Sequence, residues 1–200
     1  MRIVELIIEE DEELSGIDAI SIVEYPAIEE NFVALKNDKE YKLAEVDTDK
    51  RLLTGALLIP NKTIYRKDGE DEYYIYFSKD TVRKASEMYL INNKQNNSTF
   101  EHQFELSGLS LVESWILEDK EKDKSAIYDM DLPLGTWLGT VKVNNEKVWQ
   151  EFVKTGMVKG FSIEGYFTEK TKKEELSREI EAGIELLKIK QMILEDGNRK

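Results

Sequence analysis

The sequence has no cysteine and only one histidine, and each scarcity removes a class of chemistry. Without cysteine the chain can form no disulfide, thiolate nucleophile or zinc–sulfur cluster. One histidine also excludes the common metal sites that need several. Only 3 prolines are present, so there is no proline-rich linker. No apolar run approaches the roughly 20 residues of a membrane-spanning helix, so we expect a soluble, intracellular protein with no membrane contact.

Basic residues are fewer than acidic ones: the sequence has 28 Lys and Arg against 41 Asp and Glu, and its formal net charge is -13. Residues 1–50 hold 5 basic and 15 acidic residues, a net charge of −10. Such a field repels phosphates, so nucleic acid is not an expected partner. A hydrophobic content of 40% is enough to bury a core. We expect an acidic N-terminal arm over 1–36 with one strand joining the body, a body over 37–168 and a tail over 169–200.

Extended segments predominate in the arm and the body. Two helices are predicted: one over 79–91 with Ser78 as its N-cap, and one that begins at Asn144 or Asn145 and ends at Gly156. Regular alternation of strands and helices is lacking, which predicts an α+β domain with mainly antiparallel strands. A turn over 67–70 should join the strands predicted over 52–59 and 73–77 in a hairpin-like pair. The predicted strands are 17–24, 52–59, 73–77, one that starts at 99 and runs through His102 towards a turn at 107–108, 109–117, 136–143 and 158–167.

The tail has the periodicity of an amphipathic helix. Leu176, Ile180, Ile184 and Leu187 recur at intervals of four, four and three residues, which places them on one face. Exposure of this stripe to water is unfavourable. We therefore expect the helix to pack against the body or to mediate contact with another chain, including self-association.

His102 and Ser162 are the side chains best suited to acyl transfer. Histidine can exchange a proton near neutral pH, and His102 is predicted on a strand face between Phe100 and Phe104. Ser162 lies on the more polar face of the last predicted strand, where Gly160 leaves space beside the hydroxyl. Each residue alone is also compatible with an ordinary structural role.

A third group is needed to orient the histidine ring and stabilise its charged form. A hairpin that turns near 107–108 would place Glu113 beside His102 on the same face, so Glu113 is the preferred candidate. Glu164 is the main alternative, because it shares the face of Ser162. Asp129 and Asp131 lie in a predicted loop and remain open as well.

Several short segments occur in an order that resembles the tailed-phage prohead maturation proteases. The match covers roughly residues 15–168. Its most distinctive segment is 160–165, Gly-Phe-Ser-Ile-Glu-Gly. The other segments are 15–24 with 26–29 and 31–32, 55–60, His102, 112–116 and 135–137.

The resemblance implies a serine endopeptidase related to the herpesvirus assemblins, built on a small β-barrel wrapped by a few helices. Its nucleophile would be Ser162 and its base His102, with no metal or organic cofactor. Assemblins use a second histidine that this chain lacks. If any group takes that place here it must be a carboxylate, and the resemblance does not fix which one, so Glu113 is predicted from the hairpin alone. The substrates would be the scaffold and the major capsid protein, and often the protease itself, inside the immature capsid in the host cytoplasm.

Two other interpretations remain open. The chain could be a non-catalytic capsid-assembly or scaffold-binding protein with the protease fold, since the acidic arm and the amphipathic tail also suit docking. It could also be a cellular binding module that matches these segments by chance. A Ser162 hydroxyl within hydrogen-bond reach of a His102 ring nitrogen would favour the protease.

Overall fold

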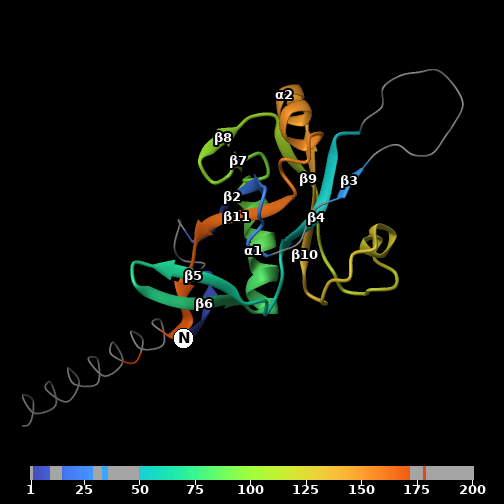
Figure 1. Cartoon of the computed structure of the whole chain (residues 1–200). Coiled ribbons are helices and arrows are strands. Elements are labelled where there is room, and N and C mark those ends of the chain that lie inside the picture. The colour runs from blue at the N-terminus through green and yellow to red at the C-terminus, as the bar shows by residue number, and fades with distance from the viewer. Residues whose placement is uncertain (1, 10–14, 29–32, 36–49, 172–177, 179–200) are drawn as a thin grey trace, which may run out of the picture.

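A computed structural model describes residues 2–9, 15–28, 33–35, 50–171 and 178, which form three four-stranded sheets (Figure 1). The first sheet has the order β12-β1-β6-β5 and contains β1 (Arg2–Ile7), β5 (Ile64–Asp68), β6 (Asp71–Phe77) and β12 (Thr168–Glu169). The second has the order β3-β4-β10-β9 and contains β3 (Val33–Leu35), β4 (Leu52–Leu58), β9 (Leu109–Ile116) and β10 (Trp137–Val143). The third has the order β11-β2-β7-β8 and contains β2 (Gly16–Val23), β7 (Ser98–Phe100), β8 (Phe104–Leu106) and β11 (Gly160–Tyr166).

Helix α1 (Lys79–Ile91) lies in the middle of the molecule and packs against β2, β9 and β10 (Figure 1). Ser78 is its N-cap, as predicted, and the Ser78 hydroxyl accepts a hydrogen bond from the Thr81 amide at 3.4 Å. Tyr89 of α1 is fully buried against Trp137 of β10, with ring centroids 5.7 Å apart in an edge-to-face arrangement. Such aromatic pairs add about 0.5–1.5 kcal/mol beyond the area they bury. This contact joins the helix to the second sheet.

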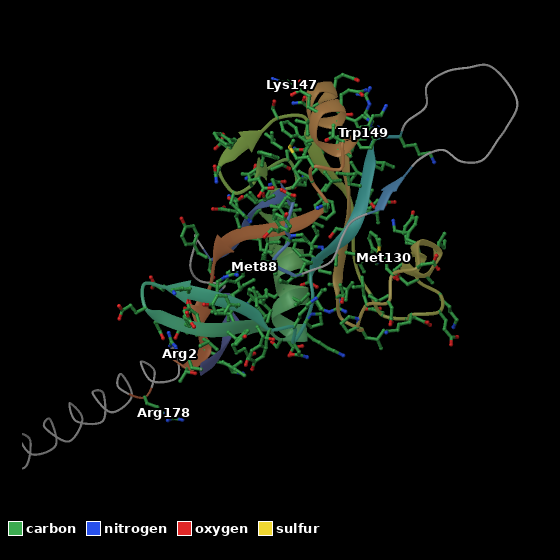
Figure 2. The ribbon with its side chains drawn as sticks, viewed as in Figure 1. Arg2, Met88, Met130, Lys147, Trp149 and Arg178 are labelled. Atoms are coloured by element: carbon green, nitrogen blue, oxygen red, sulfur yellow. The ribbon has the colours of Figure 1, made fainter. Side chains whose placement is uncertain are left out.

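The second predicted helix is present but irregular. Asn145 caps α2 (Glu146–Val148) by accepting from the Val148 amide at 3.2 Å, and the π-helical turn η2 (Trp149–Val153) follows directly. A short 3-10 helix, η1 (Lys124–Tyr128), lies in the loop between β9 and β10. The core reaches from Met88, in the middle of the molecule, to Trp149 at the start of η2 (Figure 2).

The turn predicted over 67–70 exists, but it joins a different pair of strands. Gly69, with a φ of 60°, lies between β5 and β6, which pair antiparallel. The sequence had paired 52–59 with 73–77. In the structure β4 instead pairs with β3 and β10. Apolar periodicity identifies a strand but carries no information on its partner, which explains the error.

The described residues among the first 36 contribute three strands, where the sequence predicted one. In addition to β2, strand β1 pairs parallel with β6 and β3 pairs antiparallel with β4. The amphipathic helix predicted in the tail falls almost entirely on 172–177 and 179–200, which lie outside the described residues. The prediction that it mediates self-association is therefore untested.

The α+β class with mainly antiparallel strands is confirmed. Of the described strand pairs only β1 with β6 and β2 with β7 are parallel. A closed β-barrel is not confirmed, because each of the three described sheets is open and has two edge strands. For the site, the important sheet is the third, whose edge strand β11 carries Ser162.

Candidate active site

Three hydroxyl side chains form a row across the third sheet. Ser162 on β11 pairs with Ser21 on β2, and Ser21 pairs in turn with Thr99 on β7. Paired residues project to the same face of a sheet, so the three hydroxyl groups line one surface. All three residues are buried, with Ser162 8% exposed. The strand pairing thus brings together residues that are up to 141 positions apart in the sequence.

Glu164 connects this row to the histidine. It lies two residues after Ser162 on β11, so its side chain projects to the same face. The Glu164 Oε1 atom is 3.1 Å from Nδ1 of His102 and also accepts a hydrogen bond from the Thr99 hydroxyl. The carboxylate therefore holds one ring nitrogen of His102 and leaves Nε2 for another partner.

His102 lies in a tight turn rather than on a strand face, which corrects the prediction of a strand through this residue. The turn connects β7 and β8 and is closed by a hydrogen bond from the Gln103 amide to the Phe100 carbonyl, 3.0 Å long. Glu101 and His102 have φ values of 50° and 58°. A positive φ at both central residues is the geometry of a type I′ turn, which ordinarily uses Asn and Gly.

The surrounding strands hold this unfavourable turn in place. The His102 amide donates to the buried Ser21 hydroxyl at 3.1 Å, and the Glu101 amide donates to the Ile22 carbonyl at 3.2 Å. The Glu101 carboxylate accepts from the Glu24 amide at 2.6 Å. Backbone strain of this kind costs about 1–3 kcal/mol per residue and is concentrated at functional sites. Here it presents the imidazole next to Glu164.

Ser162 and His102 lie on the same side of the sheet without a direct contact. The Ser162 hydroxyl forms no hydrogen bond with any residue in the described part of the chain, His102 included. The structure thus provides the pair between His102 and a carboxylate, and it places the serine two residues from that carboxylate. The final link between serine and histidine is not formed in this structure.

Glu113 occupies a separate cluster on the second sheet. It pairs with Thr140 across β9 and β10, and its carboxylate accepts hydrogen bonds from the Thr140 hydroxyl and the Lys124 ammonium group. The Lys124 hydrogen bond and then that of Thr140 lower the pKa of Glu113. The hairpin that was predicted to bring Glu113 beside His102 does not form, because β7 pairs with β8 while β9 pairs with β10. The structural argument for Glu113 is therefore lost.

The other two carboxylates also lie away from the histidine. Asp129 ends η1 with a left-handed backbone, at a φ of 55°. Asp131 is exposed and pairs with Lys120 at 2.8 Å, and this contact lowers the pKa of Asp131. Among the four candidate carboxylates, Glu164 is the one that contacts His102 in the described structure.

Gly165 explains part of the distinctive 160–165 segment. A β-bulge falls between Glu164 and Gly165, and a Cβ atom added at 165 would lie 2.8 Å from the Ile17 Cα atom and closer still to the Gly16 carbonyl. A side chain at this position would push β11 away from β2. Glycine therefore keeps Ser162 and Glu164 in register with Ser21.

Two cavities adjoin the site. Ser162 lines a cavity of about 360 Å³ between β11, β4 and the first sheet, where apolar side chains alternate with polar ones that include Arg66 and Glu169. Glu164 and Thr99 line a polar cavity of about 420 Å³, together with Asp18 and Lys94, which form an ion pair at 2.8 Å. Both cavities therefore offer polar as well as apolar groups to a ligand.

Sequence analysis missed Ser21 and Glu101, which position the turn. Ser21 is a small polar residue at a fully buried strand position, and the only sequence signal was a hydroxyl within the otherwise apolar run Ala-Ile-Ser-Ile-Val. Glu101 is next to the histidine in the sequence, and nothing in the local pattern distinguished it from the other carboxylates. Neither role can be inferred without knowing that β2 pairs with β7.

The described residues contain no cluster of acidic or histidine side chains suited to a metal ion. Within the same ranges, no helix has both the length and the apolar character needed to span a membrane.

Comparison with known proteins identifies the family. Residues 40–171, about two thirds of the chain, match the family model described as "Putative phage serine protease XkdF". The match includes His102, Glu113, Ser162 and Glu164. Neither the comparison with curated proteins nor the one with solved structures found a match. The chain belongs to the XkdF family of phage serine proteases.

Proposed function

We propose that the chain is an active serine endopeptidase of phage prohead maturation that cleaves the scaffold and extensions of the major capsid protein, and often itself, inside the immature capsid. One observation carries the catalytic part. The Glu164 carboxylate lies 3.1 Å from Nδ1 of His102 and two residues from Ser162 on one strand face. A carboxylate, a titratable base and a hydroxyl are the three parts of a serine hydrolase site.

The roles follow from this arrangement. Ser162 is the nucleophile and His102 the general base. Glu164, rather than Glu113, is the orienting carboxylate, because it accepts the proton on Nδ1 and so fixes the tautomer in which Nε2 can take a proton. The Thr99 hydroxyl donates to the same carboxylate and holds it in place.

The reaction is acyl transfer. The Ser162 Oγ atom forms a bond to the scissile carbonyl carbon while its proton moves to Nε2 of His102. His102 then gives this proton to the leaving amine nitrogen as the C–N bond breaks. In the second half, water loses a proton to His102 and attacks the acyl-serine, and the returning proton releases Ser162 and the new carboxyl end.

The missing hydrogen bond between Ser162 and His102 is compatible with this mechanism. In serine hydrolases without substrate, catalytic hydrogen bonds are often long and shorten when the substrate binds. The 42% exposed His102 side chain stands on a turn of two residues, so a small rotation of the ring is sterically open.

The test is incubation of the full chain with its cognate scaffold and capsid protein, with the products identified by mass spectrometry. Wild type should cleave, and Ser162→Ala should lower turnover by several orders of magnitude with an unchanged melting temperature. Ser110→Ala, on β9 and hydrogen-bonded to Asn96, is the matched control and should cleave normally. Turnover by Ser162→Ala equal to that of wild type would overturn the assignment of the nucleophile.

A non-catalytic role in capsid assembly is the second candidate, and the absence of a Ser162–His102 hydrogen bond among the described residues favours it. This function predicts that wild type and Ser162→Ala bind the scaffold equally well and that neither cleaves it. A fluorophosphonate probe separates the two functions, because it labels a serine only when a base activates the hydroxyl.

A further inference from the structure

The outer strand of the first sheet borders a surface cavity that the mechanism above does not use. Strand β5 is last in the order β12-β1-β6-β5, so its outer side has no partner strand among the described residues (Figure 1). The cavity has a volume of about 680 Å³ and lies between residues 63–66 on one side and residues 24–27 with Lys159 on the other. Consecutive residues of a strand project to alternate faces. A cavity lined by four of them in a row therefore follows the strand edge, and we call it the edge groove.

Arg66 gives the edge groove a positive charge that no neighbour neutralises. Its guanidinium donates to the Tyr65 carbonyl at 3.0 Å, and no carboxylate in the described part of the chain forms an ion pair with it. The other charged residues of the groove, Glu24 and Lys159, lie 3.7 Å apart and pair with each other. A carboxylate that enters the groove therefore finds a guanidinium available, and guanidinium groups bind carboxylates through two parallel hydrogen bonds.

Exposed tyrosines stand on both sides of the edge groove. Tyr25 is 78% exposed and its ring lies 5.3 Å from the Lys159 ammonium group. Across the groove, Tyr65 is 46% exposed and packs edge to face on Tyr74, with ring centroids 5.8 Å apart. Tyrosine is enriched in protein interfaces, because its ring buries apolar area while its hydroxyl forms hydrogen bonds. An unpaired strand edge, exposed tyrosines and an available cation together fit an acidic peptide in extended conformation.

We propose that an extended peptide segment of another protein binds in the edge groove by adding a strand to β5, and that Arg66 selects a carboxylate side chain of this segment. In strand addition, main-chain hydrogen bonds supply the affinity and side-chain contacts supply the specificity. The groove is separate from the contact between His102 and Glu164. Its role is to capture a partner, so the inference goes beyond the proposed function and does not depend on it.

The first experiment measures binding of labelled octapeptides to the full chain by fluorescence anisotropy. One peptide alternates Glu with Thr, and the other alternates Gln with Thr. Wild type should bind the Glu peptide about tenfold more tightly than the Gln peptide, because a hydrogen bond to a charged group is stronger than one to a neutral group. This preference should shrink as salt is added. Equal affinity for the two peptides would overturn the selection of a carboxylate.

Arg66→Gln tests the cation. Affinity for the Glu peptide should fall about tenfold, to that of the Gln peptide, and the melting temperature should not change, because the side chain is exposed. Arg83→Gln is the matched control. Arg83 is an exposed residue of α1 that pairs with Glu118 at 2.6 Å, and its variant should keep wild-type affinity. Equal losses in the two variants would show a general charge effect and contradict the role of Arg66.

Strand addition is tested on the peptide, with the wild-type chain unchanged. Two forms of the Glu peptide carry N-methyl groups on the odd or on the even amides. A strand at a sheet edge directs every second amide to its neighbour, so one form should lose binding and the other should keep it. The same effect from both forms would overturn strand addition.

Binding of neither octapeptide by wild type would overturn the whole inference and leave the proposed protease function standing. Sedimentation then shows whether another occupant takes the edge. A dimer of wild type that Arg66→Gln dissociates would assign the edge groove to a second copy of this chain instead of a partner peptide.

Discussion

Two glutamates on different sheets have almost the same local surroundings. Glu164 on β11 accepts a hydrogen bond from Thr99 on the same sheet and contacts His102. Glu113 on β9 accepts one from Thr140 on the neighbouring strand and contacts Lys124. Each cluster thus consists of a carboxylate, a threonine hydroxyl and a basic side chain. The two differ in the basic side chain and in what lies beside it.

The difference decides which cluster can do chemistry. Lys124 is held over the Trp115 ring, 4.0 Å from the centroid. It can serve as a structural cation but not as a proton shuttle. An imidazole is the side chain that most often acts as a general base, and the carboxylate that contacts His102 belongs to Glu164, two residues after Ser162 on β11. A carboxylate paired with a lysine is thus a common structural arrangement. A carboxylate paired with a histidine, next to a buried serine hydroxyl, is an arrangement expected of a catalytic site.

The largest expected effect separates the two glutamates directly. Glu164→Gln should lower kcat by about 10³- to 10⁴-fold, because an amide neither fixes the histidine tautomer nor stabilises its charge. Glu113→Gln is the matched control and should keep wild-type turnover. Both are measured by single-peptide kinetics with thermal melts to confirm folding.

The reverse result would restore the original prediction. Full activity in Glu164→Gln with loss in Glu113→Gln would assign the role to Glu113. Full activity in both variants would favour Asp129, Asp131 or a dyad of Ser162 and His102 alone.

The two threonines provide a second matched pair with a smaller effect. Thr99→Val removes the hydrogen bond that holds the Glu164 carboxylate. Because a group that acts through another residue contributes less than the residue itself, kcat should fall about tenfold, with little change in KM. Thr140→Val should leave kcat unchanged and lower the free energy of unfolding by about 1–3 kcal/mol, because the buried Thr54 hydroxyl loses its partner at 2.9 Å. Equal losses of kcat in both variants would contradict a positioning role for Thr99.

The smallest expected effect is the pH dependence of stability at Glu113. Its pKa is lowered in the folded protein, first by the Lys124 hydrogen bond. The stabilisation is therefore complete above the pKa of the unfolded chain and is lost as pH falls through the lower folded pKa. Melting temperatures of wild type and Glu113→Gln should differ most near pH 7 and converge in acid. A difference that stays constant with pH would show that the ion pair does not contribute.

Much of the secondary structure follows from local pattern. The Ser78 cap and the spacing of Val82, Ala85 and Tyr89 are sufficient for α1, because both act within one or two helical turns. The strands β2, β4, β6, β9, β10 and β11 also match their predicted segments closely. His102 was assigned to a strand because its flanking phenylalanines alternate, and that pattern cannot reveal two successive residues with positive φ.

The sequence by itself determined the chemistry that is available: one histidine, a serine in a distinctive segment and a surplus of carboxylates, without cysteine. The order of these segments was enough to predict a phage serine protease, and the family match confirms this part of the prediction. Only the tertiary structure decided that β2 lies between β11 and β7, which puts Ser21 under the His102 turn and brings Glu164, of the four carboxylates, into contact with His102. The physical reason is that strand pairing and register depend on contacts between residues far apart in the chain, and a shift of one residue would reverse every side chain on the strand.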